Sequence, residues 1–180
     1  MQRISAVPLE TTDEAVAPLF SAIRAKMGGV PNIMRTMAQS PAALEAYLGL
    51  SNALGKGRFT AGERELIALA AAGENSCDYC ASAHTALGKM AGLGQADMQQ
   101  VIAGGELSGG NGAIIAMVRT IVSRKGVISD AEIEAFYAAG FDAGHLVELI
   151  AATAMNIFTN YFNHIAATDI DFPVVSTKAA

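Results

Sequence analysis

The sequence predicts an all-α protein. Alanine, leucine, isoleucine and methionine supply most of its apolar side chains, and runs of alternating β-branched residues are scarce. Both features favour helices, because strands are built from β-branched residues that recur with a period of two. The chain has 180 residues and is 52% hydrophobic, which is enough to bury a sizeable core. We therefore expect one domain over residues 1–180.

Local signals place the first half of the helices. Residues 11–29 are predicted to form a capped helix that Gly28 and Gly29 end, because glycine closes helices in the left-handed conformation. Residues 32–40 follow, and Pro41 suits the first turn of the next helix, over 41–57. Thr60, with Glu63 three residues later, predicts a capping box for a helix over 60–73.

The second half of the chain continues in the same manner. We expect helices from the cysteine segment to about 90, and over 94–104, 111–126, 129–140 and 142–168. Residues 169–180 lack a helical pattern and are expected to form an extended C-terminal arm across a neighbouring element or subunit. A short recurrence, Glu65-Leu66-Ile67-Ala68 against Glu148-Leu149-Ile150-Ala151, is compatible with two degenerate helical repeats or with chance recurrence in an Ala/Leu-rich chain.

Charge and targeting signals exclude several classes of function. The chain has 12 basic and 17 acidic residues, a net charge of -5, and no basic cluster longer than Arg124-Lys125. Nucleic acid is therefore not expected as a partner. The first residues lack the apolar core of a signal peptide, and the apolar stretches are interrupted before they could span a membrane. We expect a cytoplasmic protein with no membrane partner.

The only two cysteines lie close together in "ENSCDYCASAH", residues 74–84. If Asn75 or Ser76 caps the helix, then Cys77 lies in its first turn and Cys80 and His84 share one face with it. The helix N-terminus favours a thiolate, and His84 is one turn from Cys80. A cysteine pair of this spacing can close to a disulfide, which is the basis of a redox cycle.

The cysteine segment is also compatible with roles that involve no redox chemistry. The cysteines could simply fill space in the core. A zinc ion could use Cys77, Cys80 and His84, with His145, His164 or a carboxylate as its fourth ligand. Among redox sites, a thioredoxin-like one is disfavoured, because it needs a preceding strand that this sequence does not offer.

The cysteine segment and its surroundings resemble a known family, the AhpD-like alkylhydroperoxidases of the carboxymuconolactone decarboxylase superfamily. The signature is Glu-x11-Cys-x2-Cys-x3-His, and Glu65, Cys77, Cys80 and His84 stand at that spacing. The segments "GGVPN" upstream and 128–173 downstream are similar to the longer, peroxidase-related branch. The resemblance covers most of the chain and is strongest over 59–93.

The resemblance implies an all-helical, homo-oligomeric thiol peroxidase. Cys80 would be the peroxidatic thiolate, Cys77 the resolving cysteine, and His84 the base, oriented by Glu65 in a proton relay. The substrate would be an organic hydroperoxide and the reductant an external dithiol or redox protein. No bound cofactor or metal is expected. A true decarboxylase is disfavoured, because those members do not rely on a cysteine pair.

One residue departs from the family pattern. Well-described members have a second histidine just before the second cysteine, and this chain has Tyr79 there. With a pKa near ~10, tyrosine is a poor base at neutral pH. We expect Tyr79 to pack first and, at most, to line the site. An alternative function is a non-enzymatic redox sensor or assembly module that uses the same cysteine pair.

Overall fold

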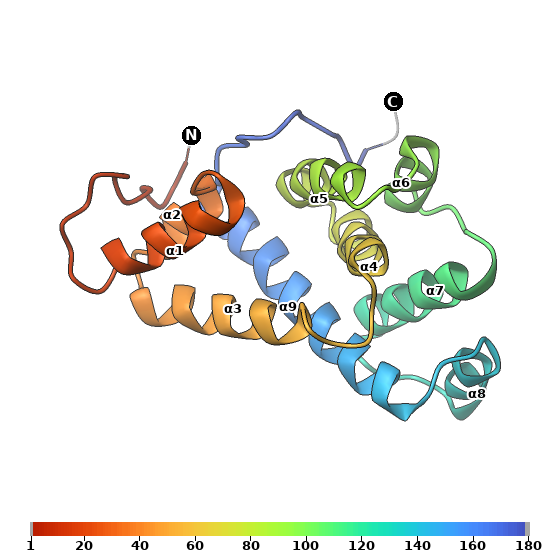
Figure 1. Ribbon diagram of the computed structural model, residues 1–180. Helices are drawn as coiled ribbons and strands as arrows, with labels where there is room; N and C mark the ends of the chain where they lie inside the picture. Colours follow the sequence, from red (N-terminus) through yellow and green to blue (C-terminus); the bar gives the residue numbers. More distant parts are fainter. Residues whose placement is uncertain (1, 179–180) are drawn as a thin grey trace.

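The computed structural model describes residues 2–178, and within them every regular element is a helix (Figure 1). The prediction of an all-α protein is thus confirmed. The helices are α1 (Ala17–Met27), α2 (Asn32–Met37), α3 (Pro41–Leu54), α4 (Ala61–Glu74), α5 (Asp78–Met90), α6 (Gln95–Ile102), α7 (Gly109–Ser123), α8 (Asp130–Ala138) and α9 (Ala143–Ala166). None of these described helices is long and apolar enough to cross a membrane.

The start of α1 is a correction to the sequence prediction. The helix begins at Ala17, several residues after the expected start at 11. Proline lacks an N–H and disfavours helical geometry in the residue before it, so Pro18 suits only the first turn. The Asp13 carboxylate instead closes a turn by accepting from the backbone N–H groups of Ala15 and Val16. The end is as predicted, because Gly28 adopts a left-handed φ of 78°.

Helix α4 lies at the centre of the fold. Its residues from Leu66 to Ala72 are each no more than 1% exposed. A helix that is apolar on every side must be covered on every side, and α4 packs against α5, α6, α7 and α9 (Figure 1). The capping box of Thr60 and Glu63 sets its start, as predicted. This central position fixes where Glu65, in the second turn of α4, meets α5.

The two copies of the short recurrence lie in different surroundings. The first copy begins in α4, and its cysteines follow after a break, in and just before α5. The second copy lies wholly within α9, so Glu148 and His164 are separated along one helix by about 24 Å at 1.5 Å per residue. The second copy therefore does not bring its glutamate to its histidine as the first copy does.

The C-terminal arm runs across α5 (Figure 1). Val175 donates its backbone N–H to Ser82 Oγ at 2.9 Å, and Thr177 donates to the Asp78 carboxylate at 2.8 Å. Asp78 and Ser82 both belong to α5, so the arm is held along the helix that carries Cys80. Residues 179–180 of the expected arm lie outside the described residues.

Candidate active site

The turn between α4 and α5 determines where the cysteines sit. Cys77 is the N-cap of α5, with an extended backbone, and Cys80 donates its N–H to the Cys77 sulfur at 3.3 Å. The expectation that Asn75 or Ser76 would cap this helix is therefore wrong. Ser76 adopts a left-handed φ of 53°, and Cys77 donates its N–H back to Ala72 in α4. Because these residues still complete the end of α4, α5 cannot start before Asp78.

The two sulfurs are in direct contact. Cys77 Sγ donates to Cys80 Sγ at 2.8 Å, and both thiols are free. Their side chains are buried, at 1% and 3% exposure. A disulfide bond is about 2.05 Å long, so bond formation needs only a small movement of the two sulfurs. The geometry therefore suits a reversible dithiol and disulfide pair.

The contact makes the two thiols chemically unequal. The hydrogen bond from Cys77 lowers the pKa of Cys80 to about 6; burial opposes this shift, and the charge of His84 and hydrogen bonding from Asn163 support it. Cys77 has a raised pKa, first because it donates to Cys80 and then because it is buried. Cys80 is thus the thiol that ionises more readily, and Cys77 is the one that keeps its proton.

Glu65 and His84 form the charged pair behind the cysteines. Glu65 Oε2 lies 2.7 Å from His84 Nδ1, and their side chains are only 18% and 23% exposed. Burial lowers the pKa of His84, but the negative charges of Glu65 and Cys80 outweigh it and hold the pKa above its ordinary value. A protonated His84 in turn favours the Cys80 thiolate. The predicted contact between Glu65 and His84 is therefore present.

His84 and Cys80 shift each other's pKa although no hydrogen bond joins their side chains. Between these two described side chains, no direct hydrogen bond is present, and their coupling is electrostatic. Nδ1 of His84 is engaged with Glu65, so Nε2 is the atom left to exchange a proton with a water or a substrate. A proton moving between Cys80 and His84 would pass through such a molecule.

Tyr79 is a packing residue in this structure, in line with the sequence interpretation. Its side chain is 4% exposed and meets the Phe172 ring edge to face at 5.8 Å between centroids. Its hydroxyl donates to Asp171 Oδ1 at 2.7 Å and accepts from the Ile33 N–H at 3.1 Å. Burial, as the largest cause, raises the pKa of Tyr79 further. With its hydroxyl engaged on both sides, Tyr79 ties the C-terminal arm and α2 to α5.

Sequence reasoning missed three residues that surround the site. Asn163 Nδ2 donates to the Cys80 sulfur at 3.3 Å, and Asn160 lies one turn earlier on α9. Tyr47 belongs to α3, and burial followed by the charges of Cys80 and Glu65 raises its pKa to about 12. The asparagines carried a signal, because polar residues at helical spacing in an otherwise apolar helix need buried partners. Tyr47 carried none, since its spacing is that of an ordinary core residue.

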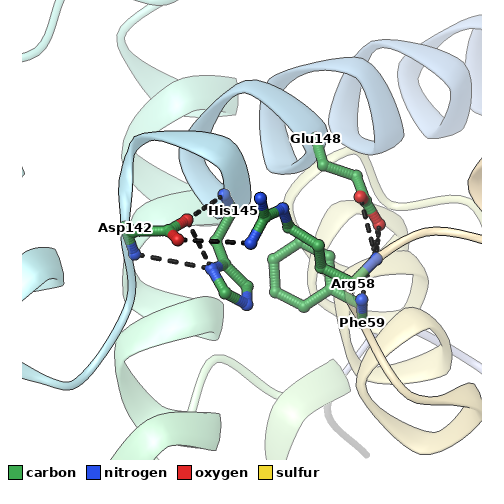
Figure 2. A network of polar contacts seen from close by, with 5 residues as sticks. All are labelled: Arg58, Phe59, Asp142, His145 and Glu148. Atoms are coloured by element: carbon green, nitrogen blue, oxygen red, sulfur yellow. Dashed lines mark hydrogen bonds and ion pairs between the residues drawn. The ribbon is translucent and has the colours of Figure 1, made fainter.

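A second pair of histidine and carboxylate lies at the start of α9 and helps to join this helix to the loop before α4 (Figure 2). His145 Nδ1 lies 2.7 Å from Asp142 Oδ1, and Arg58 reaches the same carboxylate at 3.2 Å. Glu148 accepts the N–H groups of Arg58 and Phe59, so the loop before α4 is fastened to the start of α9 (Figure 2). The chain has only two cysteines, and both lie in the α4–α5 segment, so His145 and Asp142 have no cysteine on which to act as a base.

The two histidines considered as a fourth zinc ligand are engaged in other contacts. His164 bonds the Ser76 carbonyl at 3.3 Å, and His145 is engaged by Asp142. Across residues 2–178, no three His, Cys, Asp or Glu side chains come together as a metal site requires.

Comparisons with known proteins agree with the predicted resemblance. The sequence profile of the Carboxymuconolactone decarboxylase family matches residues 41–122, and no protein of curated function matches significantly. An uncharacterised peroxidase-related protein from Ralstonia eutropha JMP134, with an alkylhydroperoxidase AhpD core, is 23% identical, with a TM-score of 0.85 over 94% of this chain and 92% of that one. An uncharacterised peroxidase-related protein from Silicibacter sp. TM1040 is 20% identical, with a TM-score of 0.80 over 93% and 91%.

A further structural match is the debrominase Bmp8, solved as a cysteine-to-alanine variant with 2,3,4-tribromopyrrole. It is 14% identical, with a TM-score of 0.78 over 93% of this chain and 91% of that one. At these identities the matches establish the fold. The family segment 41–122 includes Glu65, both cysteines and His84. Residues 41–122 therefore match the carboxymuconolactone decarboxylase family, and the chain has an AhpD core-like all-α fold.

Proposed function

We propose that this protein is a thiol-dependent peroxidase that reduces organic hydroperoxides through a Cys77–Cys80 dithiol and disulfide cycle. The observation that carries the proposal is the contact of the two buried sulfurs, 2.8 Å apart, at the N-terminus of α5. The difference in pKa between the two cysteines supplies one thiolate and one protonated thiol. The Glu65 and His84 pair supplies the positive charge that supports this inequality.

In the first step, the Cys80 thiolate attacks the terminal oxygen of the hydroperoxide. An S–O bond forms and the O–O bond breaks, which leaves Cys80 as a sulfenic acid and releases an alkoxide. His84, which holds the proton lost by Cys80, returns it through a water, and the alkoxide leaves as an alcohol. The raised pKa of His84 keeps that proton available at neutral pH.

In the second step, the Cys77 sulfur attacks the sulfur of the sulfenic acid. The S–S bond forms, the S–O bond of Cys80 breaks, and the hydroxide leaves as water with the proton of Cys77. The order of events follows from the contact between the two thiols. The Cys80 thiolate raises the pKa of Cys77, and this effect disappears once Cys80 is oxidised. Cys77 therefore becomes reactive only after the first step.

Return to the dithiol requires a reductant from outside the chain, because the sequence has no third cysteine. An external dithiol or a dithiol redox protein would attack the disulfide, leave as a disulfide and restore both thiols. We also propose that the protein assembles into homo-oligomers. Exposed apolar side chains along α9 support this assembly: Val147, Ile150, Phe158, Tyr161 and Ile165.

Cysteine variants test the cycle. Reduced wild-type protein should consume an organic hydroperoxide repeatedly with a dithiol present, Cys80→Ser should consume none, and Cys77→Ser should leave a sulfenic acid that dimedone traps. Activity of both variants at the wild-type level would refute the proposal. A single turnover with no recycling would favour the redox-sensing or assembly module. Because the debrominase Bmp8 shares this fold, 2,3,4-tribromopyrrole should be assayed beside the hydroperoxide.

A further inference from the structure

Two buried asparagines on α9 approach the sulfur of Cys80. Asn163 Nδ2 donates to this sulfur at 3.3 Å. Asn160, one turn earlier, is 0% exposed, and its side-chain amide acts with that of Asn163 to lower the pKa of Cys80. The sulfur therefore accepts from Asn163 on α9 as well as from Cys77 at the start of its own helix.

The amide of Asn160 is held in one orientation. Its Oδ1 accepts from Asn75 Nδ2 at 2.8 Å, so its own Nδ2 cannot also face Asn75. Within residues 2–178, this buried Nδ2 has no hydrogen-bond partner. A buried donor without an acceptor destabilises the fold. The Cys80 thiolate can serve as its acceptor, because a charged acceptor binds a donor more strongly than a neutral thiol does.

A third asparagine on the same face gives the contrast. Asn156 is 5% exposed, as Asn163 is, but it donates to the Ala152 carbonyl of its own helix at 2.9 Å. From Leu149 to Ala166, α9 has no Asp, Glu, Lys or Arg, and its one histidine, His164, contacts the Ser76 carbonyl. The polar groups that this stretch of α9 presents to Cys80 are therefore neutral amides.

We propose that Asn160 and Asn163 form an amide cradle that stabilises the Cys80 thiolate by donating hydrogen bonds to its sulfur. Asn163 touches the reacting atom and is a catalytic residue, whereas Asn75 is a positioning residue that holds Asn160. The inference rests on the proposed function for the attacking role of Cys80.

The cradle differs from the titratable groups around Cys80. Those groups are Cys77, Tyr79 and His84 on the cysteine segment and α5, Tyr47 on α3 and Glu65 on α4. His84 supports the thiolate only while it is protonated. The amides keep their donors at every pH, so they support the thiolate even when His84 is neutral.

The test is the apparent pKa of Cys80, measured from the pH dependence of its alkylation by iodoacetamide. The full-length reduced chain is used, and mass spectrometry locates the modified cysteine. Asn163→Leu and Asn160→Leu remove a donor at similar volume and should each raise the pKa by about one unit, since hydrogen bonds to charged groups carry energies of that order. Asn156→Leu is the matched control and should leave the pKa of Cys80 unchanged.

Shifts from the cradle variants no larger than that of Asn156→Leu would overturn the inference. If a leucine variant does not fold by circular dichroism, Asn163→Ala or Asn160→Ala should give the same shift with a smaller side chain. Asn75→Ala should give part of the Asn160→Leu shift, which a purely structural role would not produce.

The readout needs no peroxide, so the two proposals fail separately. A pKa shift in a protein that does not turn over hydroperoxides would support the cradle and refute the proposed function. Turnover without any shift in the cradle variants would do the reverse.

Discussion

Replacing Glu65 with glutamine removes the charge behind His84 while keeping the shape of the side chain. The contact that changes is the 2.7 Å pair between Glu65 Oε2 and His84 Nδ1, both less than a quarter exposed. A hydrogen bond to a charged group contributes about 1.5–3 kcal/mol, and one pKa unit corresponds to about 1.36 kcal/mol. The pKa of His84 should therefore fall by about one to two units in Glu65→Gln.

Two assays follow this change. Titration by NMR should show one of the three histidine signals moving to lower pKa. Hydroperoxide turnover near pH 7 should fall by about 10- to 100-fold, because the protonated fraction of His84 falls about tenfold for each unit by which its pKa drops below the pH. Because the folded pKa of His84 is raised, its stabilising effect is full below the unfolded pKa and disappears as pH rises through the folded value. The stability difference between wild type and Glu65→Gln should therefore shrink as pH rises.

Asp142→Asn is the matched control, because it breaks the other pair of carboxylate and imidazole, also at 2.7 Å. It should leave the titration of His84 and the hydroperoxide turnover unchanged. If Glu65→Gln left the His84 signal where it is in the wild type, the reasoning about this pair would be refuted.

Three further predictions concern reactivity and packing. The pKa of Cys80 lies near 6, below its ordinary 9.0, so the rate of alkylation of Cys80 should rise through pH 6 and level off by pH 8. The thiolate should also stabilise the reduced fold at high pH, and this stabilisation should be lost as the pH falls through about 6. A rate that still climbs steeply between pH 8 and 9 would contradict this. Tyr79→Phe should lower the free energy of unfolding in urea by about 1–3 kcal/mol, because Asp171 and the Ile33 N–H lose their partner, yet leave the alkylation rate of Cys80 within twofold; a large loss of reactivity would place Tyr79 in proton transfer. Gly73→Ala puts a Cβ 2.6 Å from the Ile102 carbonyl oxygen and should destabilise the fold by about 1–3 kcal/mol. Gly49→Ala, whose Cβ meets nothing within 4 Å, should stabilise the fold by about 0.5–1 kcal/mol. The opposite order of melting temperatures would refute the packing argument.

Helix positions were predictable wherever the signal is local. The capping box of Thr60 and Glu63 and the glycine stop at Gly28 involve residues within one turn of each other, and both are confirmed. The predicted start of α1 was wrong, because Thr11, Thr12 and Asp13 resemble a cap while Pro18 determines where the helix can begin. The predicted cap of α5 was wrong for a similar reason, since the left-handed turn at Ser76 belongs to the end of α4.

The site was predictable only in part. The helical wheel placed Cys80 and His84 together, and the contact with Glu65 came from the family spacing, which already reflects how α4 meets α5. Asn163 lies on α9, far along the sequence from Cys80, and only tertiary packing brings its amide to the sulfur. No local pattern relates such residues. What the sequence does show is an unusual set of asparagines in an uncharged helix, which indicates buried polar partners without naming them.

The most direct test of the central claim is steady-state consumption of an organic hydroperoxide by the reduced protein, with a recycling dithiol in excess. The account predicts many turnovers per protein, one Cys77–Cys80 disulfide formed for each hydroperoxide reduced when the dithiol is omitted, and complete loss of both in Cys80→Ser. Consumption that stays at the no-protein rate, or that continues unchanged in Cys80→Ser, would contradict it.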